Sequence, residues 1–249
     1  MKVIVNADDF GVNGIVTSEI ERMINLGCVT STTIMANGLC LDEVRKFAGR
    51  NPQVSYGVHL CLSEFESITH SPVLYKYGIT DTEGRFVRMA IFKVKHFNEE
   101  LKSALKDELD AQIEVVKSLD IPLSHCDSHH HVHTIYQLRE VFSEVLRQQG
   151  FSKIRRAYEY GTLRMKLHLF SWQKQMKVNK FYSDMFTTAQ VFLSYSEFCH
   201  NPKDVEIAEL MCHPGHPGDA YKKEMGLVEN KTIFKMAPDV ELITYNDIH

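Results

Sequence analysis

The sequence lacks the features that mark membrane-spanning, exported and nucleic-acid-binding chains. None of its 249 residues lies in an apolar stretch approaching the roughly 18 residues of a membrane-spanning helix. The opening MKVIVNADDFG has no apolar run or cleavage site of the kind that a secretion signal needs. A net charge of −4 and a pI near 6.3, without clustered lysine and arginine, argue against nucleic acid as a partner. We therefore expect a cytoplasmic protein that binds neither nucleic acid nor membrane.

Cysteine pairs and flexible linkers are also missing. The six cysteines are scattered without a C-x-x-C pair, which favours reduced, mostly buried thiols. No segment rich in proline, glycine or serine divides the chain, and no internal repeat is present. We therefore expect one domain over residues 1–249, a length that is common for a single α/β barrel.

Short runs of β-branched residues alternate with helical patterns along the chain. The runs predict strands within residues 2–7, 31–37, 54–62, 122–127, 152–157, 205–215 and 240–247. The helical patterns predict helices within residues 14–27, 41–50, 98–120 and 136–150. This β-then-α order predicts an α/β fold with parallel strands joined by right-handed crossovers. Two less regular stretches are interpreted as loops that shape a substrate cleft, residues 64–98 and 163–200.

Polar residues follow the predicted strands at the points where the strands end. They come from four separate parts of the chain: Asp8 and Asp9, His59, the tract SHCDSHHHVH at residues 124–133, and His213. In parallel α/β folds the loops at the carboxyl ends of strands converge, and ligands bind there. We therefore expect the four clusters to meet at one functional site.

Asp8 and Asp9 are adjacent, so their side chains point in opposite directions as they leave a strand. One carboxylate can then bind a metal ion while the other faces a reacting water molecule. In the alternative interpretation ADDFG is a turn, and an aspartate caps the following helix. His59 likewise has two interpretations: it is either a metal ligand or a core histidine that is hydrogen-bonded to the backbone.

Five of the 13 histidines lie in the tract SHCDSHHHVH. Imidazole and carboxylate suit zinc and other first-row divalent ions, and a catalytic site needs about three protein ligands and an open position for water. His125, Asp127 and His129 share one face if the segment is extended, whereas His129 and His133 share one if it is helical. Asp127 could accept the second ring proton of a metal-bound histidine.

The other histidines near this rim have less specific patterns. His213 precedes a proline and a glycine that would fix a loop and aim the imidazole into the cleft, and histidine suits a general acid near neutral pH. An ordinary loop histidine is the alternative. His216 is interpreted as structural. For His130 and His131, solvent exposure or packing is as good an explanation as a direct role at the site.

Taken together, the motifs resemble a known family. VNADDFG, STTIMANG, GVHLCL, HCDSHHHVH and ELMCHPG occur in this order over residues 3 to about 215. In this they are similar to the YdjC-like carbohydrate deacetylases, which include the chitooligosaccharide deacetylases. The resemblance implies a single-domain distorted (β/α) barrel, similar to a TIM barrel with loop elaborations, and one divalent metal ion at its rim.

The resemblance also implies a role for each matching residue. Asp9, His59 and His129 would bind the metal, Asp8 would be the general base and His213 the general acid. The implied reaction removes N-acetyl groups from small β-linked amino sugars, and the implied protein is cytosolic and a homodimer. The metal stays open, with magnesium and zinc as the leading candidates, because such a ligand set accepts several divalent ions.

Four further residues are candidates for a supporting role around the metal or the substrate: His125, Asp127, His133 and Arg155. The guanidinium of Arg155 or Arg156, at the end of a predicted strand, could orient Asp8 or bind a sugar hydroxyl. An ordinary pair of surface arginines explains the same two residues.

Two other functions compete with deacetylation. A metal-dependent phosphoesterase on a similar barrel would use two or three metal ions and more basic groups than this rim offers. A non-enzymatic protein that buffers metal or binds a regulatory partner through its histidine tract would bind several ions loosely and would not depend on Asp8. The middle loops and the residues after MCHPG follow no family pattern, so the sugar stays open.

Overall fold

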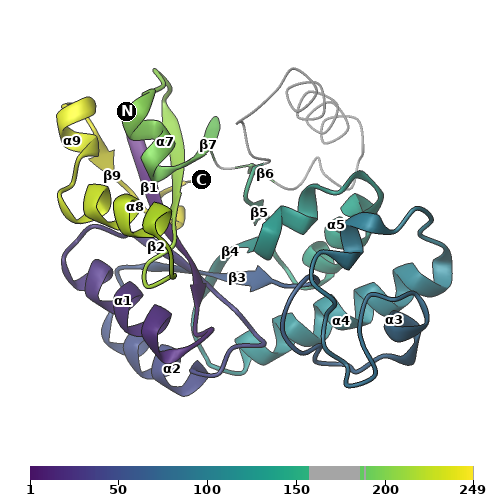
Figure 1. Cartoon of the computed structure of the whole chain (residues 1–249). Coiled ribbons are helices and arrows are strands. Elements are labelled where there is room, and N and C mark those ends of the chain that lie inside the picture. The colour runs from purple at the N-terminus through teal and green to yellow at the C-terminus, as the bar shows by residue number, and fades with distance from the viewer. Residues whose placement is uncertain (157–185, 188, 249) are drawn as a thin grey trace.

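Strand β1 (Lys2–Phe10) pairs with other strands along both of its edges (Figure 1). The structure is a computed structural model and describes residues 1–156, 186, 187 and 189–248. Val3, Ile4 and Val5 favour a strand because β-branched side chains fit a pleated backbone. Every residue of β1 after Lys2 is buried, as is typical of a parallel strand that is covered on both faces.

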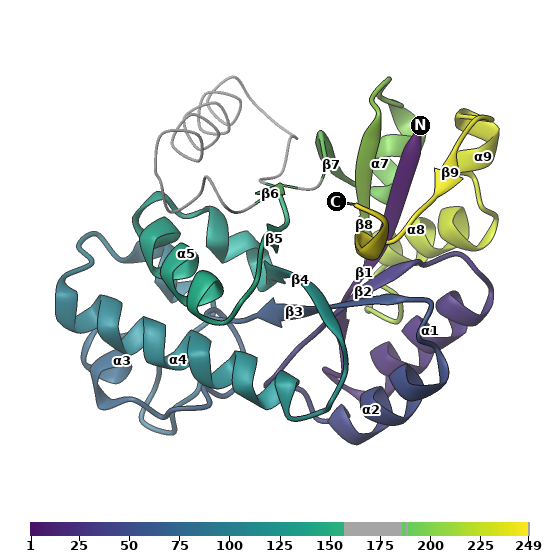
Figure 2. The ribbon, with the colours of Figure 1, turned by 180° about the vertical axis from the view of Figure 1, so that it is seen from behind.

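Eight further strands complete the sheet within the described residues: β2 (Ser31–Ile34), β3 (Ser55–Leu60), β4 (Leu123–Ser128), β5 (Lys153–Ile154), β6 (Phe186–Thr187), β7 (Val191–Ser194), β8 (Ile207–Cys212) and β9 (Glu241–Leu242). Their order is β6-β5-β4-β3-β2-β1-β8-β7, and β9 pairs with β1. All pairings between these strands are parallel. The sheet curls into a half-barrel whose end strands β6 and β7 approach each other (Figures 1 and 2). The predicted distorted (β/α) barrel is confirmed.

Helices cover the outside of the curled sheet: α1 (Gly14–Asn25), α2 (Leu41–Arg50), α3 (Pro72–Lys76), α4 (Glu99–Lys117), α5 (Arg139–Gln148), α7 (Tyr195–His200), α8 (Asp219–Glu229) and α9 (Ile233–Met236). Helix α1 begins where the Asn13 side chain accepts hydrogen bonds from the backbone of Ile15 and Val16. The apolar residues of α4 from Leu101 to Val116 that repeat at helical spacing are buried. Among the described helices, none is both long and apolar enough to cross a membrane.

Alternation along the strands separates an apolar outer face from a polar inner face. The outer residues join the main hydrophobic core between strands and helices: Val3, Val5, Ala7, Val58 and Cys126. The residues that alternate with them point into the curled sheet: Asn6, Asp8, Gly57, His59, His125 and Asp127. A barrel lined by polar side chains needs partners for each of them, because a buried polar group without a hydrogen bond is costly.

The structure differs from the sequence-based prediction mainly near the C-terminal third. The stretch 163–200, interpreted as a loop, contains β7 and α7, and its residues 163–185 and 188 lie outside the described part. A capping box starts α7, since Ser194 and Glu197 bond each other's backbone N–H groups. The late strand predicted over 240–247 is only Glu241–Leu242, and a 3-10 helix follows at Tyr245–Asp247. Helices α3, α8 and α9 were not predicted, and β5 is shorter than expected.

Gly57 on the inner face of β3 generates a prediction on stability. A Cβ atom at this position would lie 2.6 Å from Cε1 of His125, whose ring is stacked on Tyr245 with centroids 3.6 Å apart. We therefore expect Gly57→Ala to lower the free energy of unfolding by about 1–3 kcal/mol, as overpacking does. Urea unfolding measures the change. The control is Gly49→Ala in α2, where an added Cβ meets nothing within 4 Å. Equal loss in both variants would contradict the prediction.

Candidate metal centre and its surroundings

The backbone turns sharply at Asp9, and this turn brings two adjacent carboxylates to one place. Asp9 has a φ of 68°, in the left-handed region, and the pairing of β1 with β2 shifts between Ala7 and Phe10. In a regular strand Asp9 would point to the outer face, away from Asp8. The irregular backbone instead directs it to the inner rim, so that buried oxygens of both Asp8 and Asp9 lie close to His59.

Asp9, His59 and His129 converge from three separate segments of the chain. Asp9 Oδ1 lies 3.1 Å from His59 Nε2 and 2.9 Å from His129 Nδ1. One ligand atom from each residue lies within 4.8 Å of the other two, and the group is almost closed to solvent. Two imidazoles and a carboxylate are a ligand set that zinc and other divalent ions accept. The three residues therefore fit a single metal ion.

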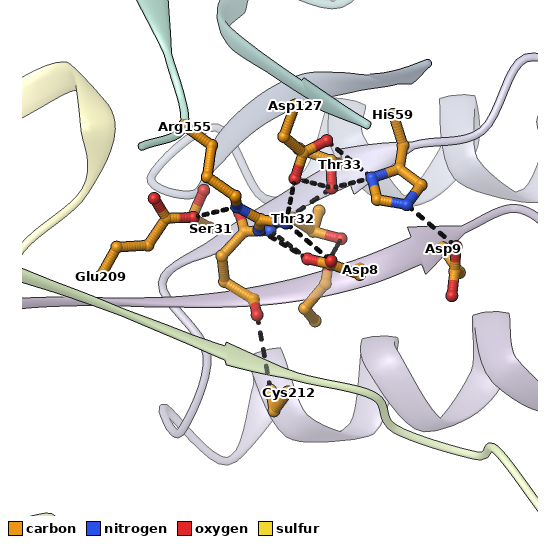
Figure 3. Close-up of polar contacts among 12 residues, drawn as sticks. Asp8, Asp9, Ser31, Thr32, Thr33, His59, Asp127, Arg155, Glu209 and Cys212 are labelled. Carbon is orange, nitrogen blue, oxygen red and sulfur yellow. Dashed lines mark hydrogen bonds and ion pairs between the residues drawn. The ribbon is translucent and has the colours of Figure 1, made fainter. Parts of the chain in front are cut away.

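Asp127 contacts the ring nitrogen of His59 that does not face Asp9, and so orients the ring (Figure 3). Its Oδ1 lies 2.6 Å from His59 Nδ1, and its Oδ2 accepts a hydrogen bond of 3.0 Å from the Thr33 hydroxyl. With Nδ1 facing Asp127, Nε2 of His59 faces Asp9 and is the ring nitrogen that a metal ion would use, as in metal-binding histidines. Burial lowers the pKa of His59, but the charges and hydrogen bonds of Asp127 and Asp9 outweigh burial and raise the pKa well above its usual value.

Arg155 is fully buried and binds three carboxylates at once (Figure 3). Its Nη1 and Nη2 each donate to Asp8 over 2.7 Å, its Nη1 lies 2.8 Å from Asp127 Oδ2, and its Nε donates to Glu209 over 2.7 Å. Burial alone would raise the pKa of Asp8, but Arg155 lowers it well below the usual value. Of the two roles considered for Arg155, orientation of Asp8 matches this contact. The buried guanidinium is enclosed by carboxylates, which leaves it no path to a sugar hydroxyl.

His213 follows β8 and is held by Glu224 of α8. The backbone N–H of His213 donates to Glu224 Oε2 over 3.0 Å, and Nδ1 of its ring lies 3.5 Å from the same oxygen. Burial lowers the pKa of His213, but Glu224 and the charge of Asp8 raise it above the ordinary value. This shift favours the protonated imidazole, which suits a group that donates a proton.

Two residues that lie at the site were not predicted to belong to it. His216, interpreted as structural, lies with Nε2 3.0 Å from Asp9 Oδ2, on the side of the carboxylate away from His59 and His129. Glu64, in a stretch interpreted as a loop, lies with Oε2 3.2 Å from His129 Nε2. Glu64 can thus accept the second ring proton of His129. The repeated His-Pro-Gly in CHPGHPG was the sequence signal that could have placed His216 beside His213 at the site. No comparable signal marked Glu64.

His125 and His133 turn away from Asp9, His59 and His129, whereas the His130 ring lies with its centroid 4.1 Å from that of His129. Nδ1 of His125 lies 2.8 Å from the Ser124 hydroxyl, and Nδ1 of His133 contacts the hydroxyl of Ser128. Both are fully buried, and burial lowers the pKa of each well below the usual value. His130 and His131 have left-handed backbones, with φ of 52° and 55°, so the helical spacing considered for His129 and His133 does not form. Neither His125 nor His133 hydrogen-bonds to Asp9, His59 or His129 in the described part of the chain.

Comparison with known sequences gives matches over most of the chain. The model of the YdjC-like protein family matches residues 2–244. A carbohydrate deacetylase of Clostridium beijerinckii is 26% identical over 264 aligned residues that span 100% of both chains. A carbohydrate deacetylase of Vibrio campbellii is 39% identical over 149 residues, and that alignment spans 59% of this chain and 56% of the relative.

A solved structure shares the fold. The crystal structure of a candidate cellobiose-phosphate cleavage protein from Enterococcus faecalis V583 superposes with a TM-score of 0.74 at 25% sequence identity. The match covers 98% of this chain and 97% of that chain, so the curled barrel and its helices correspond over nearly their whole length.

The contacts of Asp127 generate a prediction on metal binding. Asp127→Asn removes the charge that orients His59 and that pairs with Arg155, and loss of such a partner typically weakens metal binding about 10- to 100-fold. Calorimetric titration with zinc and with magnesium measures the affinity. Asp107→Asn, an exposed position in α4, is the control and should bind as the unchanged protein does. Unchanged affinity in folded Asp127→Asn protein would show that Asp127 does not support the ligands.

Proposed function

The chain belongs to the YdjC-like protein family, and from that premise we propose that it is a metal-dependent hydrolase that removes N-acetyl groups from small amino-sugar oligosaccharides of the chitobiose type. The relatives from Clostridium beijerinckii, aligned over its whole length, and Vibrio campbellii, aligned over part of its length, are both named carbohydrate deacetylase, which supports the reaction. The observation that carries the proposal is the convergence of Asp9, His59 and His129 beside a second carboxylate, Asp8. Amide hydrolysis needs a water molecule to be activated and a leaving nitrogen to be protonated, and the site offers groups for both.

One divalent ion held by Asp9, His59 and His129 would acidify a water molecule and polarise the amide carbonyl. Asp8 is the group that takes the proton of the water. The bidentate pairing with Arg155 keeps Asp8 ionised and fixes the direction of its oxygens, and it also lowers the pKa of Asp8. Because a carboxylate of low pKa is a weak base, Asp8 can act only on a water molecule that is already acidified.

His213 is the group that protonates the departing sugar nitrogen. Its raised pKa favours the protonated imidazole, and Glu224 holds the loop that carries His213. Without this proton a tetrahedral adduct would expel water again, because an amine anion is a poor leaving group. Asp8 and His213 approach the site from β1 and β8, which are neighbouring strands, so the two groups can serve one bound amide.

Aromatic side chains on both sides of the centre support a sugar substrate. The Phe65 ring lies 5.9 Å from His129 and is 40% exposed, and the Tyr221 ring lies 5.3 Å from His213 and is 37% exposed. Exposed aromatic rings beside converging polar groups are typical of small-molecule sites, and the apolar faces of pyranose rings pack on them. The identity of the metal, a cytoplasmic location and a homodimer stay predictions.

Acetate release tests the proposal. Purified protein is incubated with di-N-acetylchitobiose and each of zinc, magnesium, manganese and cobalt, and acetate and phosphate are both measured, with a phosphorylated sugar as a parallel substrate. We expect acetate from the acetylated sugar with at least one metal, at about one bound ion per chain. Release of phosphate alone would favour a phosphoesterase. Several loosely bound ions without turnover would favour a metal-buffering protein.

Two variants separate the roles of the paired aspartate and the histidine ligand. Asp8→Asn should keep the metal but lower turnover roughly 10²- to 10⁴-fold, the usual contribution of a proton-transfer group. His129→Ala should lose both metal and turnover. Metal content by elemental analysis and acetate release by mass spectrometry measure the two outcomes. An Asp8→Asn protein without metal would show that the roles of Asp8 and Asp9 are reversed.

A further inference from the structure

The C-terminal segment fills the end of the barrel opposite the metal centre. The backbone N–H of Tyr245 donates to the hydroxyl of Ser55 at the start of β3, and Lys153 Nζ at the start of β5 donates to the carbonyl of Tyr245 over 2.7 Å. Tyr245 is completely buried, and with Ile4 and Ile243 it forms a small apolar cluster apart from the main core. Figure 2 shows this end of the chain beside β8.

A continuous line of hydrogen bonds leads from this segment to the carboxylate Asp8. The hydroxyl of Tyr245 donates to Glu209 Oε2, and Glu209 Oε1 accepts from Arg155 Nε over 2.7 Å. The other edge of the same guanidinium holds both oxygens of Asp8. Tyr245, Glu209 and Arg155 are each 0% exposed, so solvent does not compete for these bonds.

We propose that Tyr245 and Glu209 are positioning residues that set the orientation of Asp8 through Arg155. The inference rests on the proposed deacetylation, in which Asp8 takes the proton of the water. It assigns the C-terminal segment a part in turnover, although the segment lies at the far end of the barrel from the reacting groups.

The geometry of a guanidinium explains why a contact at Nε matters at the opposite edge. The group is planar, and its N–H bonds have fixed directions, so holding Nε limits rotation of the plane that carries Nη1 and Nη2. Glu209 supplies this hold only while its own carboxylate is fixed. The Tyr245 hydroxyl fixes the carboxylate of Glu209. The Tyr245 ring is itself held in place, because it is stacked on His125 at an interplanar angle of 8°.

Tyr245→Phe tests the inference because it removes the hydroxyl and keeps the stacked ring. We expect kcat for acetate release from di-N-acetylchitobiose to fall roughly 10- to 100-fold, the cost of a small misplacement of a reacting group. KM and zinc affinity should change less than about twofold. The matched control is Tyr56→Phe, which removes a buried hydroxyl that donates to the carbonyl of Asn51 over 3.0 Å, outside this line of contacts. It should keep kcat while losing a similar amount of stability.

Glu209→Gln and the double variant distinguish positioning from general destabilisation. If Tyr245 acts through Glu209, the double variant should have the same kcat as Glu209→Gln alone, because the second change removes a contact that no longer matters. Independent, multiplying losses would overturn the inference, and so would wild-type kcat in folded Tyr245→Phe protein. If the unchanged protein itself releases no acetate with any metal, the proposed function fails and takes the inference with it.

Discussion

The buried guanidinium of Arg155 is the contact on which the polar interior depends. Asp8, Asp127 and Glu209 are each buried, and an isolated carboxylate in such a place would be very costly. Arg155, which directly follows β5 near one end of the curled sheet, pairs with all three of these carboxylates, which lie on β1, β4 and β8. Removing one partner of a buried pair leaves an uncompensated charge, so the group is both a structural and an electrostatic constraint.

From this guanidinium two series of contacts reach the candidate metal centre. One runs through Asp127 to His59 and sets which ring nitrogen faces Asp9. The other holds Asp8, the neighbour of Asp9. The same cation therefore orients a group that would bind the metal and a group that would act on the water. This coupling accounts for the position of the centre at the inner rim, where the polar faces of several strands meet.

The sequence was informative where function is concentrated in short motifs. The pair Asp8 and Asp9 and the tract around His129 were predicted to meet, and the structure brings them within a few ångströms, as the 2.9 Å contact between Asp9 and His129 shows. Their positions directly after predicted strands were sufficient for this prediction, because parallel strands place their carboxyl ends at the same edge of the sheet. Glu64, Glu209 and Tyr245 could not be predicted in the same way. Each is an ordinary residue in its local sequence, and only a distant partner gives it a role.

By itself the sequence determined the α/β order of elements, the apolar stripes of the helices and the residue types available for metal and proton chemistry, because these follow from local periodicity and side-chain chemistry. Tertiary structure alone decided which oxygen and nitrogen atoms face one another. The left-handed turn at Asp9, with its φ of 68°, and the packing of Tyr245 against His125 arise from long-range contacts. Such contacts are selected by the closure of the whole sheet, so no local pattern encodes them.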